Sequence, residues 1–356
     1  MEIHVQTFNR GEWSELYVIL YLLTNPNLII VDSKMNFITD ELYTVEKIIF
    51  ESSEKLEYRI KNKNIYLYID DKIHKDFPYE KICIKKTELL HSIIHSVTKL
   101  GSFEIPDFDT FLADFTSHHK IKSSSKNKND LLLEINDNRL HLSKMLSYSV
   151  KSSLGKSATI LNSSQNTNFE YVIENFNPKN IEYINSISTQ AKLLDRINKI
   201  EELGGKILFN KIVSPTFDYN LRLIDTELPR YLGNALLYSY QKNNKNLKDI
   251  FYLANNFDDK IISDKKLSDF LNSTSFGFMP GTKWDGQNTV TGGLLIVQTN
   301  GDVVTLDLIY HKDEVNNYLL NNTKLDSPSS SRYHMLELEE KNGKVYFTLN
   351  LQVRYK

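Results

Sequence analysis

The sequence predicts a mixed α/β protein in which helices flank short β-strands. Its 356 residues are 40% apolar and 25% charged, which provides enough apolar sequence for a sizeable buried core. Residues 8–23 carry Trp13, Leu16 and Leu20 at helical spacing, which predicts a first helix. Later in the chain, an Asn-Gly pair at 300–301 stands between two apolar runs, and this pattern is typical of a β-hairpin.

The remaining segments alternate in the same way. The first five β-rich runs are separated by polar turns, so we expect them to form a small antiparallel meander. The expected strands are 28–32, 44–50, 55–60, 65–69, 81–84, 169–173, 206–213, 292–298, 303–310, 334–339 and 345–354. The expected helices are 86–99, 107–116, 179–203, 228–243, 247–255, 264–273 and 313–321.

The stretch that begins at Asp130 predicts a β-hairpin that carries side chains suited to catalysis. An apolar strand leads to an Asn-Asp-Asn turn at 136–138, and a second strand ends at Ser152. Ser149 and Lys151 lie two residues apart, so an extended backbone places both side chains on one face. A carboxylate, a hydroxyl and an ammonium then converge, which suits a metal-dependent nuclease. An ordinary hairpin with charged ends is the alternative.

Bulk properties neither favour nor exclude nucleic-acid binding. The net charge is −2, and an acidic scaffold can still carry a local basic cleft. The single cysteine, Cys83, fits a reducing compartment. The N-terminus has no signal-peptide pattern, and no apolar run is long enough for a membrane span. We therefore expect a cytoplasmic protein without a membrane segment.

Polar loops border the hairpin on both sides. Residues 117–129 carry four lysines and no acid, which is typical either of a solvated loop or of a phosphate-contacting loop. Residues 152–168 are rich in small polar side chains that suit phosphate oxygens or base edges, although a capping and turn-rich loop is the alternative. The Gly-Lys-Ser unit at 155–157 lacks the first glycine of a phosphate loop. The candidates for DNA contact in these loops are Lys122, Ser152, Lys156, Asn162 and Asn168.

Separated segments together resemble the HpaII-like family of type II restriction endonucleases. Their order and spacing span almost the whole chain. They are Phe-Asn-Arg-Gly-Glu-Trp-Ser-Glu-Leu-Tyr at 8–17, the Ser-rich to Asn-Asp-Leu stretch at 122–131, Ser-Val-Lys-Ser-Ser-Leu-Gly-Lys-Ser-Ala-Thr-Ile-Leu-Asn at 149–162, Thr-Asn-Phe at 167–169, Thr-Gly-Gly at 291–293, Asp-Ser-Pro-Ser-Ser-Ser-Arg-Tyr at 326–333 and the terminal Leu-Asn-Leu-Gln-Val-Arg-Tyr.

This resemblance implies a PD-(D/E)XK restriction-endonuclease-like core, with a mixed central sheet flanked by helices and with added β-rich and helical recognition elements. It implies Mg²⁺-dependent cleavage of double-stranded DNA in a bacterial restriction–modification system. Asp130 matches the metal-binding acid and Lys151 the catalytic lysine, while Ser149 occupies the position of the second acid. We expect a nuclease core at 1–203 and a recognition region at 204–356.

The resemblance leaves the site one carboxylate short. Related cores place a helical glutamate beside the metal in a Gly-x-x-x-Glu helix, and Gly11 and Glu15 fit this spacing. Glu12 is the second candidate and Glu134, on the Asp130 face of its strand, is the third. Charge at a helix start is the alternative role of Glu12 and Glu15. The expected metal ligands are Asp130, Glu15 and the Val150 carbonyl.

Base recognition is expected in the second half of the chain. Arg332 suits guanine O6 and N7, and a phosphate contact suits it equally. A short palindrome such as CCGG, a homodimer on DNA and a cognate DNA methyltransferase follow from the resemblance. A related nicking or repair nuclease and a non-enzymatic DNA-binding protein are the alternatives. The candidate reading residues are Lys283, Trp284, Asp285 and Gln287 in one loop and Ser329, Ser331, Arg332 and Tyr333 in another.

Overall fold

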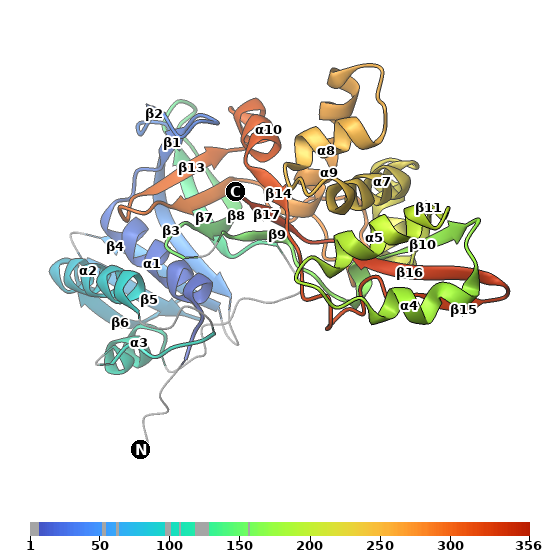
Figure 1. Ribbon diagram of the computed structural model, residues 1–356. Helices are drawn as coiled ribbons and strands as arrows, with labels where there is room; N and C mark the ends of the chain where they lie inside the picture. The colour runs from blue at the N-terminus through green and yellow to red at the C-terminus, as the bar shows by residue number, and fades with distance from the viewer. Residues whose placement is uncertain are drawn as a thin grey trace. The chain divides into compact units, whose positions relative to one another are not determined.

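The chain folds into two compact units, each built from two separate segments. The computed structural model describes residues 7–51, 55–61, 64–96, 101–106, 108–117, 128–155 and 157–356 (Figure 1). Unit 1 contains 1–158 and 288–318, and unit 2 contains 159–287 and 319–356. The expected division of roles at residue 203 stays a prediction.

Unit 1 is organised around a ten-stranded sheet. The β1–β13 and β8–β12 pairs are parallel and the other pairs are antiparallel, so the sheet is mixed, and this confirms the predicted fold class. Strands β3 to β6 form an antiparallel meander, of which β3, β4 and β5 match expected runs and β6 was not expected; the run expected at 28–32 is β1, which pairs instead with β2 and β13. In spatial order the strands are β2 (Phe37–Thr39), β1 (Ile29–Val31), β13 (Val303–Asp307), β12 (Gly293–Val297), β8 (Leu142–Ser152), β7 (Leu131–Asp137), β3 (Tyr43–Glu51), β4 (Lys55–Lys61), β5 (Asn64–Ile69) and β6 (Lys72–Pro78).

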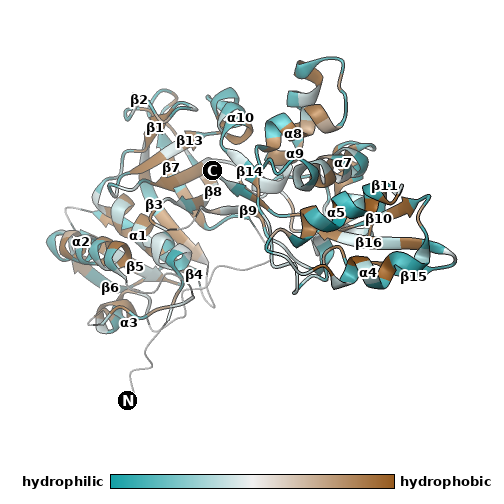
Figure 2. Cartoon of the chain, viewed as in Figure 1, coloured by the Kyte–Doolittle hydropathy of each residue, from teal (hydrophilic) through white to brown (hydrophobic). Residues whose placement is uncertain are grey.

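Helix α1 (Arg10–Thr24) is the central helix of unit 1. The Asn9 side chain accepts from the Glu12 amide and the Glu12 carboxylate accepts from the Asn9 amide, so a capping box starts the helix. Trp13 and residues 16–23 are buried, as expected for a helix that is apolar on almost every side. Apolar residues also run along β3, β7 and β13 (Figure 2). The other helices that begin in unit 1 are α2 (Tyr79–His95), α3 (Asp109–Phe115) and α10 (Lys312–Asn321).

The Thr-Gly-Gly motif allows β12 to enter the sheet beside β8. A Cβ atom on Gly292 would lie 2.3 Å from the Tyr148 ring, so only glycine permits this close packing. Gly293 has φ +139°, and a Cβ atom there would lie 2.1 Å from the Leu306 carbonyl oxygen. The Ser147 hydroxyl donates to the Thr289 carbonyl at 2.6 Å and ties β8 to the same segment.

Unit 2 contains two small sheets and a group of helices. One sheet has the order β11 (Lys206–Ile212), β10 (Asn168–Glu174), β16 (Lys344–Asn350) and β15 (Glu339–Lys341). The other has the order β14 (Thr323–Leu325), β17 (Val353–Tyr355) and β9 (Thr159–Leu161). The helices are α4 (Ile181–Ser186), α5 (Lys192–Glu202), α6 (Pro215–Ile224), α7 (Leu228–Gln241), α8 (Leu247–Ala254) and α9 (Lys260–Phe276).

Some predicted elements are wrong. Residues 81–84 belong to α2 and not to a strand, because Ile82, Leu89 and Ile93 supply one buried helical face. The expected helix at 179–203 is interrupted between α4 and α5, where the guanidinium of Arg196 donates to backbone carbonyls and stabilises the break.

Two further differences concern boundaries. Strand β7 continues through Asp137, so the turn of its hairpin is 138–141 and not 136–138. The strand expected from residue 334 begins only at Glu339, because His334 and Leu336 have positive φ angles of 48° and 56°. Across the described residues, no helix combines the length and the apolar character that crossing a bilayer requires.

Candidate active site

Asp130 stands immediately before β7, at the end of the hairpin opposite the turn. Its backbone amide donates to the Tyr148 carbonyl at 2.9 Å, which continues the antiparallel ladder by one residue. This register brings the carboxylate beside Ser149 and Val150. Its Oδ2 atom accepts from the Val150 amide at 2.7 Å and from the Ser149 hydroxyl at 3.0 Å. Two donors on one carboxylate oxygen fix the orientation of the acid.

Lys151 completes the cluster. Its Nζ atom donates to Ser149 Oγ at 2.6 Å and to the Val150 carbonyl at 2.9 Å, and lies 3.9 Å from Asp130 Oδ2. The side chains of Asp130 and Lys151 are 18% and 20% exposed, so both remain reachable from solvent. The structure thus brings together the acid, the serine and the lysine that the strand period predicted.

Ser149 is the centre of this network. It is 1% exposed, donates to Asp130 and accepts from Lys151. A carboxylate at this position would place a second negative charge against Asp130. The serine instead bridges acid and lysine as a neutral group, so this position supplies no second carboxylate.

Lys128 is a charged neighbour that the sequence reasoning did not single out. Desolvation by burial, reinforced by the charge of Lys151, lowers its pKa from 10.5 to about 8, and the charge of Asp130 opposes this shift. Lys128 precedes Asp130 by two residues and belongs to the lysine-rich stretch at 117–129, which was already a candidate phosphate-contacting loop. The site therefore contains more positive charge than the predicted lysine alone supplies.

The first turn of α1 lies beside the end of β8. Ser14 Oγ donates to Ser152 Oγ at 2.8 Å, and the guanidinium of Arg10 donates to the Leu154 carbonyl at 3.0 Å. Glu15 follows Ser14 in the second turn of α1 and is half-buried. Glu12 is engaged at the helix start, where its Oε2 accepts from the Asn9 amide at 2.7 Å.

Oxygen donors at this site suit a hard divalent cation. Asp130 Oδ1 makes no hydrogen bond to any described residue, and the Val150 carbonyl lies beside it in the cluster. Glu134, the third candidate for the missing acid, forms an ion pair with Lys47 at 2.8 Å. The described part of the chain contains no group of three or more His, Cys, Asp or Glu residues suited to a metal ion. Glu15 stays the predicted source of the second carboxylate.

Comparison with known proteins decides the family. A model of the HpaII restriction endonuclease family matches residues 9–355. The chain is 33% identical to the type II restriction enzyme HpaII of Haemophilus parainfluenzae over 364 aligned positions, which cover 98% of each protein. The chain belongs to the HpaII restriction endonuclease family. This confirms the predicted resemblance and the predicted enzyme class, a type II site-specific deoxyribonuclease. No solved structure matches the chain significantly.

Only some of the predicted DNA-contacting residues near the β7–β8 hairpin of this HpaII-family enzyme are among the described residues. Lys122 and Lys156 lie outside the described residues. Ser152 is half-buried and accepts hydrogen bonds from Ser14 and from the Leu154 amide.

In unit 2, Asn162 is exposed, whereas Asn168 is buried. The Asn350 side chain donates to Asn168 Oδ1 at 2.6 Å, so this amide stabilises the start of β10. A direct DNA contact by Asn168 stays a prediction.

The candidate base-reading loops of the enzyme are largely exposed. Lys283 lies over the Tyr219 ring at 4.6 Å, and Gln287 accepts from the Trp284 indole through its backbone carbonyl at 2.7 Å. The hydroxyls of Ser329 and Ser331 are 3.1 Å apart and exposed, and Arg332 is exposed beside them.

Tyr333 differs from its neighbours in the same loop. It is 5% exposed and its hydroxyl donates to the Ser163 carbonyl at 3.0 Å. This contact stabilises the loop from inside. Its role as a base-reading residue stays a prediction.

Proposed function

We propose that this enzyme hydrolyses double-stranded DNA with Mg²⁺ at a short palindrome such as CCGG. The observation that carries the proposal is the convergence of Asp130, Ser149 and Lys151 in a chain that matches the family from residue 9 to residue 355. Mg²⁺ is the hard cation that carboxylate and carbonyl oxygens accommodate together with phosphate.

The proposed metal ligands are Asp130, the Val150 carbonyl and Glu15. When bound, a divalent metal supplies positive charge that stabilises the scissile phosphate and activates water. Lys151 positions the attacking water or takes its proton, and its ammonium stabilises negative charge in the transition state. Ser149 holds Lys151 and Asp130 in place through the hydrogen bonds of 2.6 and 3.0 Å.

The proposed protein partners follow from the palindromic DNA sequence that the enzyme would recognise. A palindrome has two-fold symmetry, so we propose that a homodimer binds it and cuts both strands. A cognate DNA methyltransferase protects the host genome, and both proteins act in the cytoplasm. The exposed loops that carry Lys283, Gln287 and Arg332 read the bases, and the region from residue 204 onward serves recognition.

Digestion of a phage DNA of known sequence tests this proposal. The purified enzyme is incubated with Mg²⁺, and the ends of the fragments are sequenced. We expect a single set of ends at one palindrome, and no cleavage when EDTA replaces Mg²⁺. Cleavage in EDTA contradicts the metal requirement, and random ends contradict sequence specificity. Nicks confined to one strand identify the nicking alternative.

A further inference from the structure

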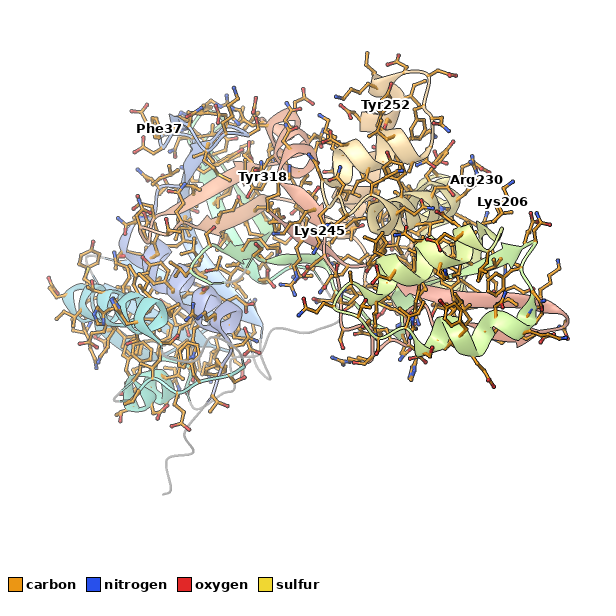
Figure 3. The ribbon with its side chains drawn as sticks, in the orientation of Figure 1. Phe37, Lys206, Arg230, Lys245, Tyr252 and Tyr318 are labelled. Carbon is orange, nitrogen blue, oxygen red and sulfur yellow. The ribbon has the colours of Figure 1, made fainter. Side chains whose placement is uncertain are left out.

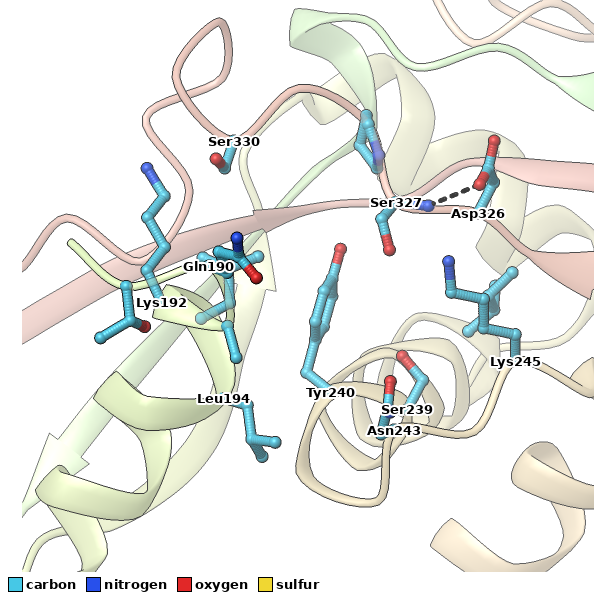
Figure 4. A pocket seen from close by; sticks show the side chains of 15 residues that line it. Gln190, Lys192, Leu194, Ser239, Tyr240, Asn243, Lys245, Asp326, Ser327 and Ser330 are labelled. Carbon is cyan, nitrogen blue, oxygen red and sulfur yellow. Dashed lines mark hydrogen bonds between the residues drawn. The ribbon is translucent and has the colours of Figure 1, made fainter. Parts of the chain in front are cut away.

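Unit 2 contains a cavity of about 500 Å³ that the proposed catalytic chemistry does not use. It is formed by the start of α5, the end of α7 and the loop after β14 (Figure 4). Its lining combines apolar side chains with hydroxyl, amide and amino groups. The polar side chains that matter for its chemistry are Gln190, Lys192, Tyr240, Lys245, Ser327 and Ser330.

The charge of this cavity is positive. Neither Lys192 nor Lys245 forms an ion pair with another described residue. The one lining carboxylate, Asp326, pairs with Arg354 at 2.8 Å and also accepts from the Ser327 amide at 2.9 Å. The lining therefore carries two ammonium groups against one carboxylate that already pairs with Arg354, and such a site attracts an anion.

Tyr240 supplies a hydroxyl donor between the two lysines. Burial raises the pKa of Tyr240 to about 12; contact with the Ser327 side chain lowers it in part and the charge of Asp326 raises it, so the phenol stays protonated at neutral pH. Its oxygen is buried and makes no hydrogen bond of normal geometry to the described residues. Figure 4 shows Lys245 and Ser327 on one side of this phenol, and Gln190 and Lys192 on the other. A buried phenol whose contact with Ser327 falls short of normal hydrogen-bond geometry can donate to a ligand that accepts hydrogen bonds.

The start of α5 adds to this preference. The helix begins at Lys192, and its N-cap residue, Ala191, makes no side-chain capping bond. The Lys192 amide already donates to the Thr189 carbonyl at 3.2 Å, and Asp195 lies in the same first turn, so the contribution of this helix start comes from the next amides and the helix dipole. The combination of two ammonium groups, hydroxyl donors and these amides matches the oxygens of a phosphate.

We infer that this cavity binds a phosphate group, carried either by the DNA backbone or by a free phosphate compound. The DNA source rests on the proposed function and deepens it. The loop that lines the cavity at 325–330 continues directly into Ser331 and Arg332, two candidate base-reading residues. A phosphate held in the cavity fixes the position of this loop on the duplex, because phosphate contacts position a protein while base contacts specify sequence.

The salt dependence of DNA binding tests the backbone source. Binding to a short duplex is measured in EDTA over a series of salt concentrations for Lys192→Gln, Lys245→Gln and Tyr240→Phe. Each lysine that contacts a backbone phosphate contributes about 0.9 to the slope of log K against log salt, so each lysine variant should lose about that amount. Tyr240→Phe should weaken binding about fivefold on every duplex sequence.

Lys206→Gln is the matched control. Lys206 is an exposed lysine of the same unit, at the start of β11 and outside the lining of the cavity (Figure 3). Its removal should leave the slope unchanged. Equal losses in Lys206→Gln and in the cavity variants show a diffuse charge effect and overturn the inference.

Inorganic phosphate tests the other source. Thermal unfolding is followed in phosphate and in chloride at equal ionic strength. Phosphate should stabilise the wild type and Lys206→Gln, but not the variants of Lys192 and Lys245. Loss of this stabilisation with an unchanged salt slope identifies a free phosphate compound as the ligand. Unchanged slopes together with unchanged stabilisation overturn the inference. Failure of the wild type to cleave DNA contradicts the proposed function alone.

Discussion

The β7–β8 hairpin carries an aspartate at each of its two ends, and the surroundings of these two acids differ. Asp137, at the turn, is 5% exposed and both of its oxygens are occupied. Its Oδ1 accepts from the Arg139 amide at 3.0 Å and from the Leu140 amide at 3.3 Å, while its Oδ2 accepts from the Tyr310 hydroxyl at 2.5 Å. The turn and its neighbours use all of this carboxylate.

Asp130, at the other end, is only partly used by the fold. Its Oδ2 is held by Ser149 and by the Val150 amide, whereas Oδ1 makes no hydrogen bond to a described residue. Lys151 stands 3.9 Å away. The comparison teaches that an acid is a candidate for chemistry where the fold orients one oxygen, leaves the other available and supplies a cation. One strand pair therefore contains both a structural and a candidate catalytic aspartate.

Exchanging each aspartate for asparagine gives the largest expected contrast. Asp130→Asn removes the charge that the metal needs and should lower the cleavage rate at least about 1,000-fold. Asp137→Asn leaves that charge in place and should cleave at the wild-type rate. The rates are measured on a plasmid with one recognition site. Equal losses in both variants contradict the distinction between the two ends.

Lys151 and Lys144, the two lysines of β8, allow the same comparison between the two ends of the hairpin. Lys151→Ala should lower the cleavage rate by about 100- to 1,000-fold, because the ammonium acts on charge that develops in the transition state. Lys144 is exposed near the turn end of the same strand, and Lys144→Ala should leave the rate unchanged. DNA binding by Lys151→Ala in EDTA should stay close to that of the wild type. Retained cleavage by Lys151→Ala removes the lysine from the mechanism.

The missing carboxylate can be located by comparing two glutamates of α1. Glu15→Gln should raise the Mg²⁺ concentration for half-maximal cleavage about tenfold and lower the maximal rate. Glu12→Ala should cost about 1 kcal/mol of stability, because the capping box is lost, and should keep the metal requirement of the wild type. Mg²⁺ titrations and thermal unfolding of both variants separate these effects. A raised Mg²⁺ requirement in Glu12→Ala alone assigns the ligand to Glu12.

Removing the bridging hydroxyl should have a smaller effect. Ser149→Ala deletes the donor to Asp130 and the acceptor for Lys151, but both charged groups and the Val150 amide contact stay. We expect about a tenfold lower rate with a nearly unchanged KM, as for loss of a group that orients catalytic residues. Ser149→Thr, which retains the hydroxyl, should recover part of the activity. A wild-type cleavage rate in Ser149→Ala would show that the backbone hydrogen bonds between β7 and β8 are sufficient to orient Asp130 and Lys151.

The geometry of the candidate catalytic end was predictable because its pattern is local. The two-residue period grouped Ser149 with Lys151, and a hairpin placed Asp130 against them. The contacts from other elements that hold this end of the hairpin in place were not predictable in the same way. β12 pairs in parallel with β8 although it follows more than a hundred residues later, and the Ser14–Ser152 hydrogen bond joins α1 to the strand end. Such contacts depend on the tertiary fold, which no local period encodes.

The smallest expected effect concerns Asp137, at the turn of the hairpin, and the pH dependence of the stability that it contributes. Burial acts to raise the pKa of Asp137, but hydrogen bonds from Tyr310 and two backbone amides outweigh it, so the pKa lies below its ordinary value of 3.8. The folded state thus favours the charged form. This contribution is present above pH 3.8 and is lost as the pH falls through the lowered pKa.

Asp137→Asn should therefore lower the unfolding free energy by about 1 kcal/mol at neutral pH, since a charge-assisted hydrogen bond is weakened. The difference from the wild type should shrink below pH 3.8, where the wild-type carboxyl also becomes neutral. Urea unfolding of both proteins at neutral and acid pH measures this difference. Tyr310→Phe is the matched control, because it removes the same hydroxyl from the opposite side of the contact. A difference that stays constant with pH assigns the stabilisation to packing, and the carboxylate at the turn then contributes no charge.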